Sequence, residues 1–323
     1  MNDVALAVRH SNSFAFFSSH SPELTRSSWN CVITLCVFTV TESQSFVGVN
    51  YGQIADNLPP PAATASLLKS TAIGKVRLYG ADAAIIKSLA NTGIGIVIGA
   101  SNGDIPTLAS DPNAATQWVN SNVLPYYPAS NITLITVGNE VVTSMDQGLI
   151  PQLLPAMRNV QNALNSVSLG GKVKVSTVHS MAVLTQSDPP SSGLFNPVFQ
   201  DALKGLLQFQ KDNGSPFAIN PYPFFAYQSD SRPETLAFCL FQPNAGRVDS
   251  GNGIKYLNMF DAQVSFYLGW AYGPIYFLFY LFFKRLTCKS TKKDYYRTTF
   301  ASHNLRKMFC FILWFFIHAW LAD

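Results

Sequence analysis

The sequence predicts an α/β fold of the (β/α)8 barrel type, and three observations support this class. Short runs rich in Val and Ile recur along residues 46–263, and a stretch of helical length follows each one. Such runs are typical of buried parallel strands. The glycine-rich loop of a dinucleotide-binding sheet is absent, because Gly48-Val-Asn-Tyr-Gly52 lacks the GxGxxG spacing. Alternating strands and helices without that loop favour a barrel over a Rossmann sheet.

About six strand–helix units are predicted, whereas a closed barrel of this type has eight. The predicted strands are Phe46–Tyr51, Lys75–Tyr79, Ile94–Ile98, Leu134–Val137, Val173–Val178 and Phe217–Asn220. The predicted helices are Ala62–Ser70, Ala114–Val123, Ile150–Val167 and Pro197–Asn213. Pro59–Pro61 and Ser110-Asp111-Pro112 precede the first two helices as start signals. An incomplete barrel leaves its first and sixth strands as exposed edges.

Composition divides the chain into three segments: residues 1–45, 46–263 and 264–323. The last segment holds 19 of the 42 aromatic residues in only 60 positions. It also carries eight basic and two acidic side chains, net +6, whereas residues 46–263 carry twelve and thirteen, net −1. The formal charge of +4 therefore belongs to the tail. A nucleic-acid partner is not expected, since it would require a basic stripe on the folded body.

The N-terminal segment indicates export. Residues 29–40 are a short apolar run after Arg26, followed by small polar residues, which is typical of a signal peptide preceded by an N-terminal extension. A buried strand is the alternative interpretation of this run. Two glycosylation sequons, Asn131-Ile-Thr133 and Asn213-Gly-Ser215, also favour export. We therefore expect a secreted protein of the cell wall or extracellular space.

The C-terminal segment is unusual in its apolar texture. Residues 266–283 are 18 uncharged, mostly aromatic or apolar residues before Lys284-Arg285, a candidate transmembrane segment with a positive flank. Membrane association through this tail is therefore an alternative localisation. Aromatic residues throughout the run, rather than at its ends, favour a different hypothesis. In that hypothesis the tail is a product of read-through or mis-splicing and was never selected as protein.

Candidate catalytic residues follow from the barrel, because chemistry in such folds lies at the carboxyl ends of the strands. Glu140 ends the fourth predicted strand and is one of only two glutamates in residues 46–263. Partial burial would suit its carboxyl to protonate a leaving oxygen. The alternative is a structural ion pair with Arg77. The other glutamate, Glu234, follows Ser231 at the spacing of a helix-capping box.

Further strand-end residues suit carbohydrate binding. Tyr79, Tyr222 and Phe225 offer aromatic faces for sugar rings, and Asn139 offers an amide beside Glu140. Simple packing is the alternative role for Tyr222 and Phe225. His179 is expected to be a core or rim histidine. No cofactor and no metal are expected, since no His, Cys and Asp residues have metal-ligand spacing.

These motifs resemble plant glucan endo-1,3-β-glucosidases of glycoside hydrolase family 17 from Val47 to Gln263. The matching segments are Val-Gly-Val-Asn-Tyr-Gly-Gln (47–53), Lys-Val-Arg-Leu-Tyr-Gly-Ala-Asp (75–82), Asn-Ala-Ala-Thr-Gln-Trp-Val (113–119), Thr-Val-Gly-Asn-Glu-Val (136–141), Pro-Phe-Ala-Ile-Asn-Pro-Tyr-Pro-Phe-Phe-Ala-Tyr (216–227) and Tyr-Leu-Asn-Met-Phe-Asp-Ala-Gln (256–263). The resemblance implies a (β/α)8 barrel that hydrolyses β-1,3-glucan with retention of configuration. It assigns Glu140 as the acid/base, Asn139 as its neighbour, and Tyr79 and Tyr222 to the cleft.

The resemblance also implies what this chain lacks. The family's nucleophile is the Glu of a Glu-Thr-Gly-Trp motif ending strand seven, and no such motif follows Gln263. The nearest Gly-Trp is Gly269-Trp270, and the only tail carboxylates are Asp294 and Asp323. The nucleophile is therefore absent, so we predict no appreciable glucanase activity for this truncated or mis-spliced chain. The alternatives are a non-catalytic β-glucan-binding protein and a membrane-tethered protein, and we expect a monomer.

Overall fold

The computed structural model describes residues 7–10, 13–16, 47–54, 56–144 and 146–263. These belong to two separate units, one within Met1–Ser45 and one beginning at Phe46. In the first unit, β1 (Ala7–His10) and β2 (Ser13–Phe16) form an antiparallel pair. The predicted signal run at 29–40 and the tail at 264–323, with its candidate span at 266–283, lie outside the described residues.

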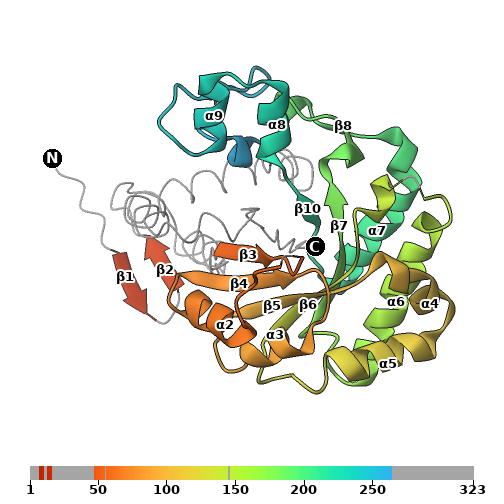
Figure 1. Cartoon of the computed structure of the whole chain (residues 1–323). Coiled ribbons are helices and arrows are strands. Elements are labelled where there is room, and N and C mark those ends of the chain that lie inside the picture. The colour runs from red at the N-terminus through yellow and green to blue at the C-terminus, as the bar shows by residue number, and fades with distance from the viewer. Residues whose placement is uncertain (1–6, 11–12, 17–46, 55, 145, 264–323) are drawn as a thin grey trace, which may run out of the picture. The chain divides into compact units, whose positions relative to one another are not determined.

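The second unit is built on a curled six-stranded parallel sheet, covered by helices on one face (Figure 1). Its strands are β3 (Val47–Tyr51), β4 (Ile73–Leu78), β5 (Gly95–Ala100), β6 (Ile132–Asn139), β7 (Lys174–Ser180) and β10 (Ala218–Asn220). The spatial order is β10-β7-β6-β5-β4-β3, so chain neighbours pair side by side. All six predicted strands are confirmed, and the first and sixth are the ends of this sheet.

The helices alternate with the strands as the pattern predicts. The α-helices are α2 (Pro61–Lys69), α3 (Ala83–Ser88), α4 (Ile105–Ser110), α5 (Pro112–Asn122), α6 (Ile150–Ser166), α7 (Gln200–Asn213), α8 (Pro223–Ser229) and α9 (Pro233–Cys239). The 3-10 turns are η1 (Asn102–Asp104), η2 (Val141–Thr143), η3 (Met181–Val183), η4 (Pro190–Ser192) and η5 (Pro197–Phe199). Two short antiparallel pairs, β8 (Leu184–Gln186) with β9 (Leu194–Phe195) and β11 (Arg247–Val248) with β12 (Lys255–Tyr256), complete the unit.

Two helix starts test the capping signals read from the sequence. Asp111 caps α5, because its side chain accepts a hydrogen bond from the Asn113 N–H at 2.8 Å. The capping box expected between Ser231 and Glu234 is wrong. The N-cap of α9 is Arg232, which makes no side-chain cap, and Pro233 begins the helix with a ring that has no N–H to satisfy.

The alternation of side chains along each strand gives the sheet two different faces. The face beneath the helices is a continuous apolar core, to which the strands contribute Val76, Leu78, Ile96, Ile98 and Ile135, among others. The opposite face holds a small second cluster of Val97, Leu134, Val178 and Ala218. Arg77 stands opposite Val97 in the pairing register and therefore shares that second face. Arg77 therefore lies on the face of the sheet that the helices do not cover.

Residues after β10 form an outlying region around α8, α9 and the β11–β12 pair (Figure 1). Asp249 ties this region to the β7–α7 connection by accepting hydrogen bonds from the backbone and hydroxyl of Ser191. Burial favours a raised pKa for Asp249, but these bonds and those from Gly251 and Asn252 outweigh it and lower the pKa. None of the described helices is both long and apolar enough to cross a lipid bilayer.

Candidate active site

The candidate site lies where the parallel strands end at their carboxyl termini. β4 delivers Arg77, β6 delivers Asn139 and Glu140, and β10 delivers Asn220. Tyr79 directly follows β4, at a position that the strand-end rule predicts. Residues more than a hundred positions apart in the sequence are brought together here because each ends a neighbouring or nearby strand of one sheet.

A distortion at the end of β6 aims Glu140. The pairing of β6 with β7 shifts register between Thr136 and Asn139, and Gly138 has a φ of +70°. Glu140 itself has a φ of +58°, in the left-handed region that non-glycine residues rarely adopt. Its N–H still donates to the Val178 carbonyl at 2.7 Å. The end of the strand therefore changes direction while it stays hydrogen-bonded to β7, as in a β-bulge near a functional site.

A chain of hydrogen bonds connects Arg77 to Glu140. Arg77 donates to the Asn220 Oδ1 at 3.1 Å and to the Asn139 Oδ1 at 2.8 Å. The Asn220 Nδ2 donates to the Glu140 Oε1 at 2.5 Å and to the Asn139 Oδ1 at 3.2 Å. The hydrogen bonds thus run from the guanidinium to the carboxyl through the Asn220 amide, while the Asn139 oxygen accepts from both Arg77 and Asn220. The alternative interpretation expected a direct ion pair.

Burial perturbs the cation of this cluster. Arg77 is only 2% exposed, and desolvation lowers its pKa to about 10, while Tyr79, Tyr222 and Glu140 act in the opposite direction. The guanidinium therefore remains protonated at neutral pH. Since an arginine can only donate, both amide oxygens must face it. The amide nitrogen of Asn220 is consequently left to face Glu140, so the polarity of the whole chain is fixed.

Aromatic rings border the cluster. The Arg77 guanidinium lies 4.4 Å from the centroid of the Tyr79 ring, and Tyr79 is 42% exposed. Tyr222 contacts Phe225 with ring centroids 5.3 Å apart, and Phe225 is 59% exposed. The structure thus places Tyr79 and Tyr222 near Arg77, with Phe225 packed on Tyr222. Exposed rings such as those of Tyr79 and Phe225 can stack on a sugar.

His179 lies in the core and not in this cluster. The sequence predicts His179 either in the core or at the rim. It is 1% exposed and stacks on Phe217 at 4.9 Å between ring centroids. Neither ring nitrogen has a hydrogen-bond partner among the described residues, and burial lowers its pKa to about 4. The imidazole is therefore neutral at physiological pH and takes no part in the site chemistry.

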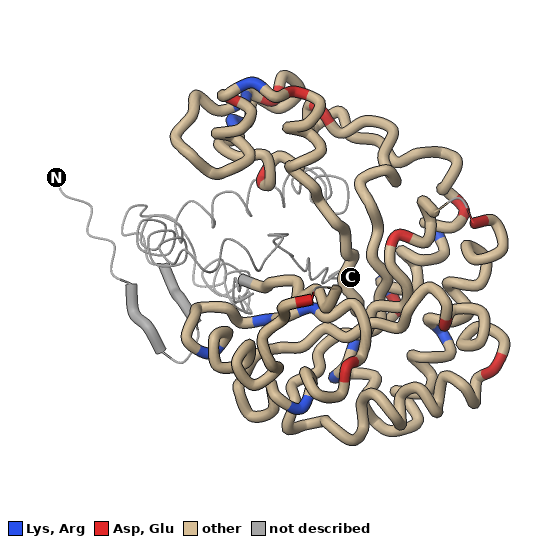
Figure 2. Tube along the Cα trace, viewed as in Figure 1, with Lys and Arg blue, Asp and Glu red and all other residues tan. Residues whose placement is uncertain are grey.

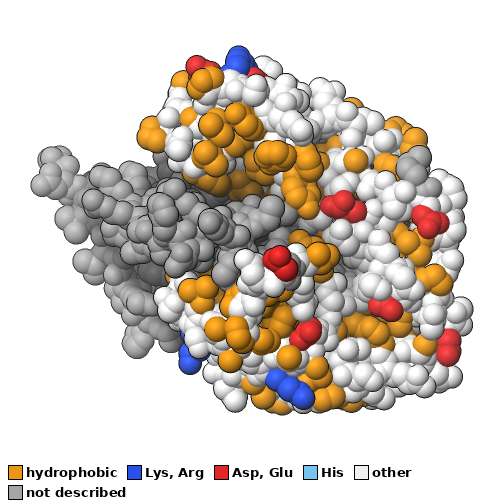
Figure 3. Space-filling view, in the orientation of Figure 1, with side chains coloured by type: hydrophobic (Ala, Val, Ile, Leu, Met, Phe, Trp, Pro, Cys, Tyr) orange, Lys and Arg blue, Asp and Glu red, His pale blue; other side chains and the backbone are white. Residues whose placement is uncertain are grey.

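Charged and apolar side chains are distributed differently over the described body. Lysines and arginines are scattered along the chain in Figure 2. Exposed apolar side chains gather over α8 and α9 in Figure 3, and the large exposed hydrophobic residues of these helices and their ends include Phe224, Phe225 and Leu240. Within the described residues, no three His, Cys, Asp or Glu side chains gather as metal ligands.

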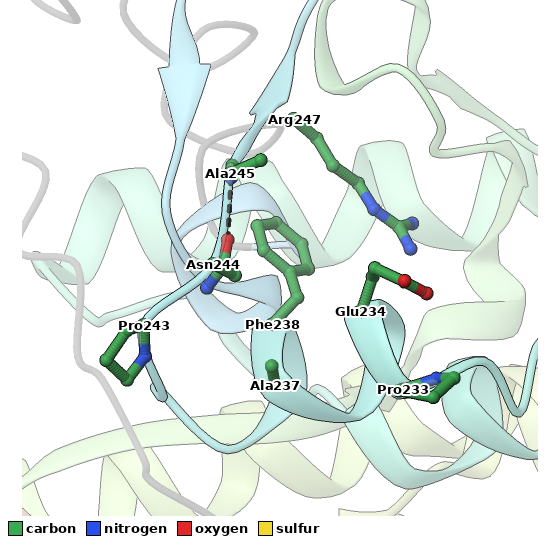
Figure 4. Close-up of a pocket in the computed structure, with 9 residues that line it drawn as sticks. Pro233, Glu234, Ala237, Phe238, Pro243, Asn244, Ala245 and Arg247 are labelled. Atoms are coloured by element: carbon green, nitrogen blue, oxygen red, sulfur yellow. Dashed lines mark hydrogen bonds between the residues drawn. The ribbon is translucent and has the colours of Figure 1, made fainter.

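A pocket of about 300 Å³ lies beside α9 and the loop that follows it (Figure 4). Glu234, Phe238 and Arg247 contribute to its lining. The Arg247 guanidinium lies 5.0 Å from the Phe238 ring centroid and donates to the Thr235 hydroxyl at 2.6 Å. None of the residues of the Glu140 cluster lines this pocket. The cavity is thus a feature of the outlying region, separate from the strand-end chemistry.

Two residues of the site were missed by sequence reasoning. Asn220 was assigned only as the end of a strand, although its amide contacts Glu140 directly. Asn102, in the turn after β5, holds the backbone of Asn139 through its side chain. The rule that polar residues at strand ends form the site would have found both. A carboxyl is a more obvious candidate for catalysis than a neutral amide. The amide of Asn220, however, can accept from Arg77 and donate to Glu140 at once.

The curled parallel sheet with alternating helices, and the polar side chains gathered at the carboxyl ends of its strands, are typical of a protein of the (β/α) barrel class. Residues 47–267 match the model of Glycosyl hydrolases family 17, and the chain belongs to this family. A glucan endo-1,3-beta-glucosidase 7 of Arabidopsis thaliana is 72% identical over 233 residues, which cover 72% of this chain and 46% of the relative. A glucan endo-1,3-beta-D-glucosidase of Olea europaea is 70% identical over 227 residues, 70% of this chain and 49% of that protein.

A solved structure agrees with the sequence matches. The beta-1,3-glucanase and allergen CJP38 of Cryptomeria japonica pollen is 41% identical and has a TM-score of 0.64, with 69% of each chain covered. Its similarity confirms the predicted fold type for the described strand–helix units. The chain spans about half the length of the two plant relatives above. The match thus concerns the part of the family that contains Glu140 and its amides.

Proposed function

We propose that residues 47–263 bind β-1,3-glucan at the Glu140 cluster, in the manner of an endo-1,3-β-glucanase. Two relatives named as glucan endo-1,3-β-glucosidases are at least 70% identical to this part of the chain. The observation that carries the proposal is the hydrogen bond from the Asn220 amide to Glu140 at 2.5 Å. Its direction follows from Arg77, which holds the amide oxygen on the other side.

This arrangement assigns a different role to each carboxyl oxygen of Glu140. Oε1 accepts from Asn220, so a proton carried by this group resides on Oε2. Oε2 is then the oxygen placed to act as general acid toward a glycosidic oxygen, in a site that also holds the second carboxylate. Asn139, held by Arg77 and Asn220 at once, fixes the neighbouring amide. Tyr79, Tyr222 and Phe225 supply the stacking surfaces for the sugar rings.

Retaining hydrolysis needs a second carboxylate about 5 Å from the first. The sequence after Gln263 contains no Glu-Thr-Gly-Trp motif, and Asp294 and Asp323 are the only carboxylates of that segment. We therefore propose that a chain of this sequence binds glucan without appreciable hydrolysis. The second candidate function, a non-catalytic β-glucan-binding protein, is favoured by this same feature.

The test measures affinity and turnover on the same preparation. Calorimetry with laminarihexaose on the full chain is expected to give binding, and an assay for reducing ends on laminarin is expected to give no release. Glu140→Gln should weaken binding, whereas Glu234→Gln, which changes the other glutamate of this region, should not. Binding absent from the full chain contradicts the proposed glucan site. Release of reducing ends that Glu140→Gln abolishes contradicts the proposed inactivity.

For localisation we propose secretion to the cell wall or extracellular space, with membrane association as the alternative. The structure distinguishes the two sequons that support export. Asn131 is exposed, whereas the Asn213 amide donates to the Phe209 carbonyl at 2.8 Å and ends helix α7. Secretory expression should add a glycan that Asn131→Gln removes and Asn213→Gln does not. Unglycosylated protein that requires detergent for extraction would instead favour a membrane-associated chain.

A further inference from the structure

We propose that Asn102 is a positioning residue that clamps the backbone of Asn139 and thereby holds Glu140 in its left-handed conformation. This inference rests on the proposed function, in which Glu140 is the acid/base group. Asn102 lies in η1, directly after β5, and does not contact the carboxyl of Glu140 in any described hydrogen bond. It acts through the peptide of the residue before Glu140.

The clamp consists of two hydrogen bonds from one side chain to one residue. The Asn102 Oδ1 accepts from the Asn139 N–H at 2.7 Å, and the Asn102 Nδ2 donates to the Asn139 carbonyl at 3.1 Å. β5 and β6 pair through the backbone only as far as Ala100 opposite Val137. The amide of Asn102 therefore replaces the backbone partner that β5 no longer provides.

The turn that this clamp holds is an unfavourable one. Gly138 and Glu140 have φ values of +70° and +58° on either side of Asn139. A glutamate in the left-handed region persists only where its surroundings compensate for the strain. The Asn139 peptide is the link between the two left-handed residues. Hydrogen bonds to both the N–H and the carbonyl of Asn139 therefore oppose relaxation of the turn from its left-handed to an extended conformation.

Asn102 is itself fixed in place. The Ser101 N–H and hydroxyl donate to the Asp104 Oδ2 at 2.7 and 2.8 Å, which closes a capping box around Asn102. A Cβ added to Gly138 would lie 3.1 Å from the Asn102 Oδ1 and 2.6 Å from Val141. The clamp and the turn are thus in close contact, and a larger residue at position 138 would displace one or the other.

The exposure of Asn102 makes the proposal testable, because its removal leaves no cavity. A matched control exists in Asn159, whose amide donates to the Leu108 and Ala109 carbonyls at 2.9 and 3.1 Å. Both side chains bind backbone groups of a distant segment with two hydrogen bonds. Only Asn102 does so beside Glu140, so the two alanine variants separate local positioning from a general loss of stability.

The experiment uses the full chain labelled with ¹³C,¹⁵N-glutamate, which contains four glutamates. Glu140→Gln identifies the Glu140 signal. In Asn102→Ala the Glu140 ¹³Cα and ¹³Cβ shifts should move from left-handed toward extended values, and laminarihexaose affinity should fall about tenfold, as for two lost hydrogen bonds that position one group. Asn159→Ala should lower the melting temperature while leaving the Glu140 shifts and the affinity unchanged.

Unchanged Glu140 shifts in Asn102→Ala would overturn the proposal, whatever happens to the melting temperature. Should Asn102→Ala fail to fold, Asn102→Asp decides, because it keeps the acceptor for the Asn139 N–H and loses the donor to the carbonyl. It should shift the Glu140 signals in the same direction, and unshifted signals would again overturn the clamp. Absence of laminarihexaose binding by the wild-type chain refutes the proposed function alone, since the shifts are measured without ligand.

Discussion

Two places in this molecule combine an arginine, an aromatic ring and a nearby glutamate, and they differ in burial. At the strand ends, Arg77 lies 4.4 Å from the Tyr79 ring centroid and is buried among amides that lead to Glu140. Beside α9, Arg247 lies 5.0 Å from the Phe238 ring centroid, and its side chain is 40% exposed. The second place has the pocket, and the first has the coupled polar network. The comparison is the basis of the proposed function, which assigns glucan binding to the connected polar groups rather than to the cavity.

We expect the largest effect from a substitution of Arg77. Arg77→Met removes the donor of two buried amide oxygens, so we expect a loss of about 3–4 kcal/mol in the free energy of unfolding. Laminarihexaose affinity should also fall, because Asn139 and Asn220 lose the partner that orients them. Urea unfolding at pH 7 and calorimetry measure the two effects. A variant with wild-type stability and affinity would show that the network does not depend on its cation.

His179 provides a second test of the difference between paired and unpaired buried groups. Like Arg77, which donates to two amides, it is a buried base, but its ring nitrogens have no hydrogen-bond partner among the described residues. Its pKa is about 4 in the folded chain, below the usual value near 6.5 in the unfolded chain. The unfolded state therefore takes up a proton first, and stability falls by about 3 kcal/mol as the pH decreases from 6.5 to 4. His179→Gln should flatten this dependence in urea unfolding.

Phe217→Leu is the control for His179, because it loses the ring stacking without removing the titrating group. It should be less stable at every pH and keep the wild-type slope. Equal slopes for His179→Gln and the wild type would show that acid sensitivity between pH 6.5 and 4 arises from other groups.

Backbone strain at Glu140 should give a smaller difference in stability, and here the smaller substituted residue should give the more stable variant. Glu140→Gly and Glu140→Ala both remove the carboxyl that accepts from Asn220, but only glycine adopts a φ of +58° without steric cost. We expect the glycine variant to be more stable than the alanine variant by about 1 kcal/mol. Thermal unfolding of the two proteins provides the measurement. An alanine variant as stable as the glycine variant would argue that the turn is not strained.

Arg247 should give the smallest effect. Its side chain is 40% exposed and donates to Thr235 and Asp230, and partly exposed contacts of this kind contribute little to stability. Arg247→Met is expected to change the free energy of unfolding by less than about 1 kcal/mol and to leave laminarihexaose affinity intact. A loss of laminarihexaose affinity equal to that of Arg77→Met would indicate that glucan binds near α9 instead.

The sequence predicted the sheet well because most strands are rich in Val and Ile and have a clear end. Its helices were predicted where they are long enough for an apolar face to repeat, as in α6. The short helices α3, α4, α8 and α9 span six or seven residues, too few for such a pattern. α4, α8 and α9 have a proline in their first turn, and Asp82 caps α3 by accepting from the Ile85 N–H.

The candidate site was predicted in part for the same physical reason. Glu140 and Tyr79 follow strands, so position alone identifies them. The roles of Asn220 and Asn102 depend on which groups face their amides, and this becomes visible only when distant strand ends meet. The direction in which His179 points depends on the strand alternation, which places it beneath the helices with Phe217. Residue type alone does not distinguish these outcomes.

The most direct test of the account is a titration of the glutamate-labelled full chain with laminarihexaose, followed by NMR. Glu140 and Glu234 mark the two places compared above, one in the strand-end network and one at the pocket. The account predicts that the Glu140 signal shifts with saturation while the Glu234 signal stays in place. A shift of Glu234 with an unchanged Glu140 would contradict it and assign glucan binding to the pocket beside α9.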